Sequence, residues 1–290
     1  MKTSELKIFV ITHKDFEMPD ISKDLYKPLL VGADNQPKYL KEKYNCDNIG
    51  DNISSKNSSY CEMTGLYWIW KNVETEYIGL VHYRRYFLND LKRFRFRYGY
   101  YVSDINNKEK HHIATYDEIK KLLENNNLIV KKSKWSWRNN LQELGKFVDK
   151  ECINETIAIL KRDPNYQNIN KFLNRHSYIE CNMFVAKKSL IDKYCEWIFE
   201  ILKQIDDLHY QNTGEYYHNR EIGYVAEILF GAWIDFNNID YKALDVLTPG
   251  SSKEFLVNGF DNGTNIYSYK QIIYKFLNKV KSLIKYILKK

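Results

Sequence analysis

Short apolar runs that alternate with helical patterns constrain the fold of this chain more than any other sequence feature. The runs with the length and composition of buried strands are Leu6–Thr12, Tyr77–Tyr83, Leu128–Val130, Met183–Ala186 and, late in the chain, Leu244–Leu247. Apolar residues recur at helical spacing over Ser59–Asn72, Thr115–Leu123, Cys152–Leu160, Ser189–Ile205 and Arg220–Trp233. Strands that alternate with helices predict an α/β fold built on a mainly parallel sheet.

The helix expected over Ser59–Asn72 carries a start signal. Ser59 is followed three residues later by Glu62, which is the spacing of a capping box. We therefore expect one continuous helix that begins at Ser59 and presents Met63 and Leu66 to the core.

Charge divides the chain into a body and a tail. The formal net charge of the 290 residues is +7, and residues 266–290 contain seven lysines with no Asp, Glu or Arg. Residues 1–265 are therefore neutral, whereas a nucleic-acid-binding body would normally be basic itself. We expect one domain over residues 1–265 and a separate segment over residues 266–290.

The tail is predicted to be a basic amphipathic helix. Its apolar residues fall on one stripe, and lysines such as Lys279 and Lys285 lie mostly outside it, which suits a helix on an anionic membrane surface. The alternative is a helix packed on the body with a solvated lysine face. Neither a secretion signal nor a run of roughly 20 apolar residues is present. The expected location is cytoplasmic, at the inner face of the plasma membrane.

Polar and cationic side chains flank the expected strands at the ends where ligands collect in parallel α/β sheets. These are Thr12 and His13 after the first strand, His82, Arg84 and Arg85 after the second, Lys131 and Lys132 after the third, and Asn182 just before the fourth. Arginines can bind phosphate oxygens bidentately, so Arg84 and Arg85 predict an anion site. Ordinary surface ion pairs are the alternative, and the neighbouring His82 favours the anion site.

The segment Lys92–Tyr101 interleaves basic and aromatic residues, among them Arg95, Arg97 and Tyr98. Such a pattern can stack on bases and neutralise phosphates of a single-stranded nucleic acid. It equally suits a carbohydrate acceptor that carries a lipid pyrophosphate, or an amphipathic edge strand with no ligand. These three interpretations stay open.

The loop Asp47–Asn57 is dense in Asp, Asn, Ser and Gly, and contains Asp51 and Asn52. Its side chains could hold ribose or sugar hydroxyls, or only cap a turn. The chain lacks G-x-G-x-x-G, the P-loop pattern and a G-x-S-x-G elbow. These absences weigh against dinucleotide-binding, NTPase and α/β-hydrolase functions.

Several strings resemble a bacterial family of capsular and exopolysaccharide glycosyltransferases, formerly catalogued as a domain of unknown function and including galactosyl- and galactofuranosyltransferase-like members. The strings are THK, DNISSKNSSYCEMTGLYWIWKN, YIGLVHYRRYF, NMFV, YCEWIFEIL and REIGYVAE. The similarity runs from about Lys7 to Trp233. It implies a GT-A-like nucleotide-sugar fold over residues 1–265, a UDP-sugar donor, and transfer of a hexose to a lipid-linked glycan.

The resemblance also implies site residues. The matching positions are Thr12, His13, Lys14, Asp51, Asn52, Glu62, His82, Tyr83, Arg84, Arg85, Asn182, Arg220, Gly223, Tyr224 and Glu227. Donor binding is expected at Thr12, His13, Asp51, Asn52, His82, Arg84, Arg85, Asn182 and Arg220. Acceptor or membrane contacts are expected at Arg95, Arg97, Tyr98, Lys279 and Lys285.

A mechanism follows as a hypothesis. The chain has no Asp-x-Asp pair to hold Mn or Mg, so a divalent cation is left open, and Arg84 and Arg85 replace or supplement it at the leaving UDP diphosphate. An inverting transfer needs a carboxylate that deprotonates the acceptor hydroxyl. Glu227 is the first candidate and Glu221 the second, whereas the alternative role of Glu227 is a buried partner of Arg220.

The expected partners are a nucleotide-sugar, a lipid-linked glycan and a membrane surface, with no nucleic acid. Two other functions remain open. One is an RNA- or single-strand-binding protein that uses Lys92–Tyr101 and the tail. The other is a non-catalytic carbohydrate-binding partner in polysaccharide assembly.

Overall fold

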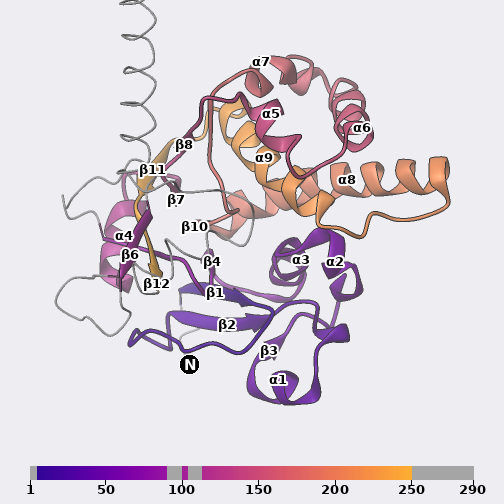
Figure 1. Cartoon of the computed structure of the whole chain (residues 1–290). Coiled ribbons are helices and arrows are strands. Elements are labelled where there is room, and N and C mark those ends of the chain that lie inside the picture. Colours follow the sequence, from indigo (N-terminus) through magenta and orange to yellow (C-terminus); the bar gives the residue numbers. More distant parts are fainter. Residues whose placement is uncertain (1–4, 90–99, 104–112, 250–290) are drawn as a thin grey trace, which may run out of the picture.

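A seven-stranded sheet forms the centre of the computed structural model, which describes residues 5–89, 100–103 and 113–249 (Figure 1). In spatial order the strands are β11 (Tyr241–Leu244), β7 (Leu128–Lys131), β10 (Phe184–Lys187), β4 (Tyr77–His82), β1 (Leu6–Thr12), β2 (Tyr26–Leu30) and β3 (Asn45–Cys46). Neighbours pair in parallel except β10, which is antiparallel to β4 and β7. The predicted α/β fold with a mainly parallel sheet is confirmed.

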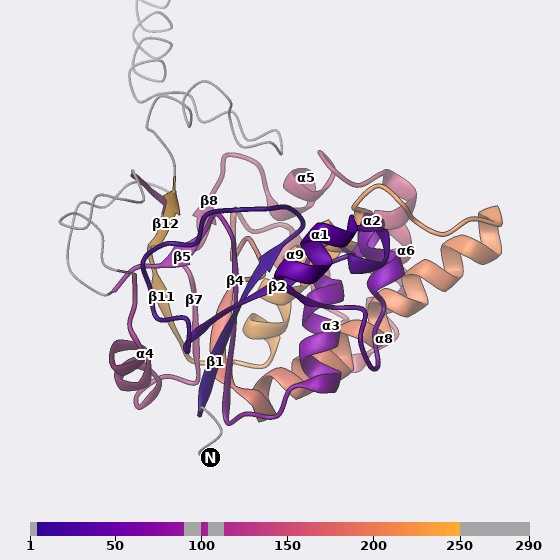
Figure 2. The same ribbon diagram turned by 90° about the horizontal axis from the view of Figure 1, so that it is seen from below.

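Both faces of this sheet are covered. The helices of one face are α3 (Met63–Asn72), α6 (Lys150–Leu160), α8 (Lys188–Thr213) and α9 (Glu221–Phe236). The other face carries α4 (Tyr116–Leu123) and a smaller sheet of β5 (Tyr86–Phe87), β12 (Val246–Pro249) and β6 (Tyr100–Ser103). Figure 2 shows α3, α8 and α9 on one side of β1 and β4, with α4 and β12 on the other.

The remaining elements are short. They are α1 (Lys38–Lys43), α2 (Asn57–Tyr60), β8 (Lys134–Trp135), α5 (Asn140–Leu144), α7 (Ile169–Leu173), β9 (Ser177–Tyr178) and 3-10 turns at Ala33–Asn35, Ser54–Lys56 and Pro164–Tyr166. β8 and β9 pair with each other in a separate two-stranded sheet.

The strand sequences read as continuous apolar runs because their side chains are buried on both sides. In β1, Phe9 and Ile11 enter the core below α3 and α8, whereas Ile8 and Val10 enter the core shared with α4. Gly65 brings α3 close to the sheet, since a Cβ there would lie 2.7 Å from Val31 Cγ1.

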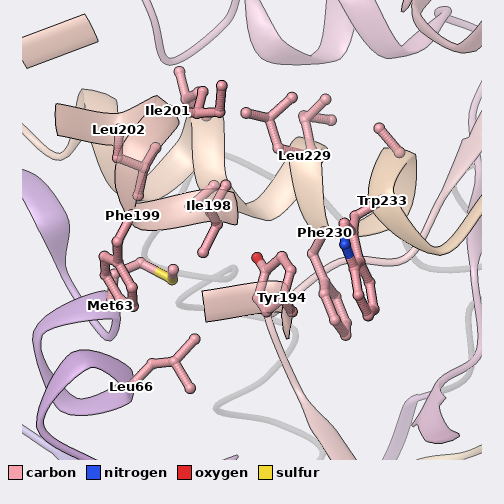
Figure 3. Packing of buried hydrophobic residues seen from close by; sticks show 14 of the residues in the cluster. Met63, Leu66, Tyr194, Ile198, Phe199, Ile201, Leu202, Leu229, Phe230 and Trp233 are labelled. Atoms are coloured by element: carbon pink, nitrogen blue, oxygen red, sulfur yellow. The ribbon is translucent and has the colours of Figure 1, made fainter. Parts of the chain in front are cut away.

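Aromatic packing joins α8 to α9. The ring of Tyr194 lies 5.1 Å from the rings of both Phe230 and Trp233. Figure 3 shows these rings beside Ile198, with Met63 of α3 closing the same core. Burying several aromatic side chains together is a large apolar contribution to stability, so the position of α9 against the sheet is firmly set.

The single helix expected over Ser59–Asn72 is wrong, and so is its capping box. The chain forms two helices, α2 and α3, separated by Cys61 with a φ of 52°. The break is supported by the Asn57 side-chain amide, which donates to the Cys61 carbonyl at 2.7 Å. Ser59 therefore lies inside α2, and Glu62 is left to make a long-range contact instead.

The late strand expected over Leu244–Leu247 is divided at Asp245. β11 ends at Leu244 and extends the large sheet beside β7, whereas β12 begins at Val246 and pairs with β5 and β6. Asp245 at the junction makes an ion pair with Lys132 at 2.5 Å.

Of the helices in the described part of the chain, none is long and apolar enough to cross a membrane.

Candidate functional site

The reversed direction of β10 brings Asn182 to the edge of the sheet where β1, β4 and β7 end. In the β10–β4 pairing Phe184 lies opposite Leu80, and the same register continued places Asn182 opposite His82. The ends of four strands thus meet at one edge, which is where α/β sheets bind ligands. We define the edge site as the side chains gathered here.

His82 is fixed at this edge by a hydrogen bond. Its Nε2 lies 2.6 Å from the carbonyl oxygen of Cys181, and since a carbonyl only accepts, Nε2 must carry the proton. Burial lowers the pKa of His82, and the charges of Arg85 and Arg84 act in the same direction, although the charge of Glu62 opposes the shift. The ring is therefore neutral and oriented at neutral pH.

Glu62 and Asn182 form the second contact of the edge site. The Asn182 side-chain amide donates to Glu62 Oε1 at 2.9 Å, which fixes the orientation of the amide because the carboxylate can only accept. Asn182 is only 3% exposed, and its buried Oδ1 has no hydrogen-bond partner among the described residues. A buried acceptor without a donor is costly, so Oδ1 suits a ligand hydroxyl.

A cationic group, made by Lys14 and Arg84, lies around the ring of Tyr83 at the edge site. Lys14 Nζ lies 5.6 Å and the Arg84 guanidinium 5.0 Å from the ring centroid, and His13 packs edge-on at 5.6 Å. Partial burial lowers the pKa of His13, and the charges of Lys14, Arg84 and Arg220 lower it further. The residues that follow β1 and β4 therefore lie close to Arg220 at the start of α9, and their charges all affect His13.

Arg220 reaches this point because α9 begins with an unusual backbone. Arg220 has a φ of 70°, its backbone N–H donates to the Ser58 carbonyl at 3.0 Å, and its Nε donates to Cys61 Sγ at 3.4 Å. A Cβ at Gly223 would lie 2.9 Å from the same sulfur, so only glycine lets α9 approach α2 this closely. The side chain of Arg220 remains exposed.

Three carboxyl groups of the edge site, Glu62, Glu180 and Glu227, interact electrostatically. Glu227 is partly exposed, and desolvation together with the charges of Glu180 and Glu62 raises its pKa to about 7. The backbone N–H of Cys181 donates to Glu227 and, with Arg85, opposes this shift. Glu227 is thus a carboxyl that is about half ionised at neutral pH.

A buried ion pair involves one of these carboxyl groups, Glu180. Lys131 Nζ lies 2.9 Å from Glu180 Oε1, with the lysine side chain fully buried and the glutamate 9% exposed. Lys131 Nζ also donates to the Lys132 carbonyl at 3.1 Å. These contacts hold the turn from β9 into β10, because Glu180 directly precedes Cys181.

The two consecutive arginines lie in different surroundings. Arg84 packs over Tyr83 and lowers the pKa of His13, whereas Arg85 lowers the pKa of Glu227 and of Cys181, and both arginines lower the pKa of His82. Both side chains are half-buried. Arg84 thus lies nearest the cationic group and Arg85 acts on the carboxyl groups, and the joint binding of a phosphate by the two arginines stays a prediction.

Backbone strain is concentrated around the edge site. Among the described non-glycine residues, those with positive φ are Cys61, Cys181, Asn182, Arg220 and Asn238. The first four are joined by the contacts above. Such conformations cost about 1–3 kcal/mol each and persist where the surrounding structure imposes them, often at functional sites.

Other residues expected at the site have local structural contacts. Thr12 is buried, and its hydroxyl donates to the Lys14 carbonyl at 2.6 Å, which shapes the turn after β1. Asp51 accepts from the Tyr67 hydroxyl at 3.1 Å, and Asn52 donates to the Gly50 carbonyl at 2.8 Å. Glu221 accepts from the Asn219 backbone N–H at 2.6 Å.

The segments predicted to contact acceptor or membrane fall largely outside the described residues. Arg95, Arg97, Tyr98, Lys279 and Lys285 all lie there, as does the whole tail. Only Tyr100 and Tyr101 of the basic aromatic segment are described, at the start of β6, which pairs with β12 at the edge of the smaller sheet.

Two residues of the edge site were missed by sequence reasoning. Glu180 lies two residues before Asn182 in the chain, so its place just before a strand could have indicated it. Cys61 had no such signal, because its positive φ and its contact with Arg220 depend on how α2 meets α9.

The carboxylates of the edge site are held by other protein groups. Within residues 5–89, 100–103 and 113–249, no three His, Cys, Asp or Glu side chains are arranged to hold a metal ion. The carboxylates present are engaged with Lys131, Asn182 or the Cys181 backbone.

Comparison with known proteins places the chain in a family. Residues 7–238 match the model of a family described as a domain of unknown function, DUF4422. The chain belongs to this family. No curated protein matches the chain. This DUF4422 chain is also similar to a solved structure described as the apo form of the bifunctional glycosyltransferase WbbM, with a TM-score of 0.75 and 28% sequence identity. The match covers 86% of the present chain and 46% of the other, so the chain spans about half the length of that protein.

Proposed function

We propose that this DUF4422 protein is a glycosyltransferase that moves a hexose from a UDP-sugar to a lipid-linked glycan acceptor. The similarity to a bifunctional glycosyltransferase supports the general activity, and the GT-A-like α/β fold supports a nucleotide-sugar donor. Galactose and galactofuranose are the first donors to test. Synthesis of capsule, exopolysaccharide or O-antigen is the proposed setting, with the tail resting on the inner face of the membrane.

One observation carries the proposal: cationic side chains from three separate segments converge at the edge of the sheet. Lys14, Arg84 and Arg220 follow β1, follow β4 and precede α9, and the charges of all three lower the pKa of His13, which packs beside Tyr83. A diphosphate is the ligand whose charge best matches such a group. The arginines can bind it bidentately and stabilise the charge that develops as UDP leaves.

Glu227 is the proposed general base. The acceptor hydroxyl oxygen attacks the anomeric carbon, the bond from that carbon to the UDP oxygen breaks, and the hydroxyl proton passes to Glu227. A pKa of about 7 suits this task, because a useful fraction is ionised while the conjugate acid is not too weak. Glu221 stays the second candidate, although its carboxylate accepts from the Asn219 backbone at the start of α9.

Asn182 is proposed to bind a hydroxyl of the donor. Its Oδ1 is the buried acceptor described above, and its amide is held by Glu62. His82 keeps the Cys181–Asn182 turn in place through its bond to the Cys181 carbonyl. Arg85 is assigned to Glu227, whose ionised form it stabilises.

The direct test is turnover of nucleotide-sugars by the full chain. A thermal-shift screen of UDP-, GDP- and dTDP-sugars, with and without Mn²⁺, identifies the donor, and release of UDP then measures turnover. Arg84→Ala is expected to lower kcat/KM for the UDP-sugar by about 100-fold. Removing one preorganised hydrogen-bonding group that stabilises the charge of the transition state has an effect of this size. Arg84→Lys should recover only part of it.

Arg162→Ala is the matched control, because Arg162 is an exposed arginine that follows α6. It should leave turnover unchanged. Equal turnover by the Arg84→Ala variant and the wild type, in the presence of chelator, would reject the role of Arg84.

A further inference from the structure

The segment that joins α8 to α9, residues 214–220, is exposed except for Tyr217, which is buried. The backbone N–H of Tyr217 donates to Asp206 Oδ1 of α8 at 3.3 Å. Its hydroxyl donates to Glu155 Oε2 of α6 at 3.0 Å. Tyr217 therefore anchors the joining segment to two helices, three residues before Arg220.

Asp206 also holds the segment against which Arg220 packs. Lys56 Nζ lies 2.8 Å from Asp206 Oδ2, and the Tyr60 hydroxyl donates to the same oxygen at 3.3 Å. Ser58 lies between these two residues in the chain, and its carbonyl accepts from the Arg220 backbone N–H at 3.0 Å. One buried carboxylate thus holds the chain on both sides of the hydrogen bond that fixes the Arg220 backbone.

Lys56 links the same two segments a second time. Its Nζ lies 4.9 Å from the ring centroid of Tyr216 and 5.4 Å from that of Tyr60. Tyr216 directly precedes Tyr217, and its ring stacks on Tyr210 of α8 with 4.5 Å between the centroids. The lysine is therefore held by both segments as well as by its carboxylate partner.

Arg220 needs this support because its backbone is strained. Its φ of 70° lies in the left-handed region, which residues with a Cβ adopt mainly where the surrounding structure imposes it. No side chain caps α9 at this position. When either segment loses its contact with Asp206, the Arg220 backbone is free to relax, and its guanidinium then leaves the place from which its charge reaches His13.

We infer that Asp206 is a positioning residue of the diphosphate site, because it keeps Arg220 in the left-handed conformation that directs the guanidinium to the diphosphate. The inference rests on the proposed function, in which Arg220 binds the diphosphate of the donor. Asp206 itself contacts no substrate and acts through Arg220. It should therefore affect the binding of the diphosphate and leave the binding of the nucleoside unchanged.

Asp206→Asn removes this support with little change in shape. An amide has one oxygen and one NH₂ group, so it can accept from Lys56 and Tyr60 or from the Tyr217 N–H, but not from both sides. In either orientation one segment meets a donor in place of an acceptor. The binding-competent conformation of Arg220 is then populated for a smaller fraction of the time, and the affinity for UDP falls in proportion.

The test compares binding of UDP and of uridine to the full chain, by calorimetry and by ligand-observed NMR. Asp206→Asn should weaken UDP binding by about tenfold and leave uridine binding at wild-type strength, because only UDP carries the diphosphate. Combined with Arg220→Ala, the same change should weaken UDP binding no further, since both residues act through one guanidinium. Weaker binding of both ligands, or effects that add in the double variant, would show a general disturbance of the fold and overturn the inference.

Asp192→Asn is the matched control, because Asp192 is also a carboxylate of α8 with a lysine partner, Lys188 at 2.7 Å, but that partner lies on the same helix. It should bind UDP as the wild type does. Lys56→Met is the second variant, for the case that Asp206→Asn does not fold. The Lys56 side chain is 38% exposed, and methionine keeps much of its apolar stem, so the fold should persist with the same selective loss of UDP affinity.

Two outcomes separate this inference from the proposed function. Equal UDP affinity in the wild type and Asp206→Asn, with weaker binding by Arg220→Ala, would overturn the inference and leave the diphosphate site standing. Equal UDP affinity in the wild type and Arg220→Ala would show that Arg220 is no diphosphate ligand, and the proposed site and the inference would then fall together.

Discussion

Replacing Glu227 by glutamine should change how the stability of the protein depends on pH. The folded structure raises the pKa of Glu227 from 4.5 to about 7. A raised acid pKa means that folding favours the protonated form, so this stabilisation is complete below about pH 4.5 and is lost as pH rises through about 7. At pH 8.5 the ionised carboxylate costs the folded state about 3 kcal/mol, an upper value because the side chain is partly exposed.

Glutamine keeps the shape and the acceptor oxygen for the Cys181 N–H but cannot ionise. Glu227→Gln should therefore unfold at nearly the same urea concentration as the wild type at pH 4, and be more stable by up to about 3 kcal/mol at pH 8.5. Urea unfolding followed by circular dichroism at half-unit pH intervals measures the difference, and pH 4 is the internal control. A stability difference that stays flat across this range would refute the account of the carboxylate cluster.

Three further predictions concern the same region. The kcat/KM for the UDP-sugar should rise with pH through about 7 and then level off, as Glu227 loses its proton; a profile unchanged in Glu227→Gln would exclude it as the base. Gly223→Ala places a Cβ 2.9 Å from Cys61 Sγ and should destabilise the fold by about 1–3 kcal/mol in urea, with weaker UDP binding; wild-type values for both would contradict the close approach of α9. Lys131→Met leaves Glu180 buried without its lysine and should cost about 3–5 kcal/mol, much of which the additional change Glu180→Leu should restore; a variant as stable as the wild type would show that the pair is not buried.

The strands were predictable because their signal is local. Leu6–Thr12 was predicted and observed with the same bounds, and the strand at Tyr77 ends one residue earlier than expected. Strands buried on both faces read as continuous apolar runs, so composition alone identifies them. The antiparallel direction of β10 was not predictable, because nothing in the sequence Phe184–Lys187 distinguishes an antiparallel from a parallel strand.

The helix break was not predictable for a related reason. The sequence from Ser59 to Asn72 has helical spacing throughout, yet Cys61 takes a φ of 52°. Contacts distant in sequence compensate for this strain, among them the bond from Arg220 to Cys61 and the approach of Gly223. The Ser59–Glu62 spacing therefore matched a cap that tertiary structure overrides.

The candidate site was predicted in part. The prediction that His82, Arg84 and Asn182 meet at one edge followed from the rule that ligands collect at strand ends, and the structure brings them together. The different surroundings of Arg84 and Arg85 depend on the turn after β4, which spacing does not specify. The membrane role of the tail lies outside the described residues and stays a prediction.

The most direct test of the central claim is a crystal structure of the full chain with UDP. The account predicts the diphosphate within hydrogen-bonding distance of Arg84 and Arg220, beside His13 and above Tyr83. A diphosphate bound away from the ends of β1 and β4, with those side chains still facing solvent, would contradict it.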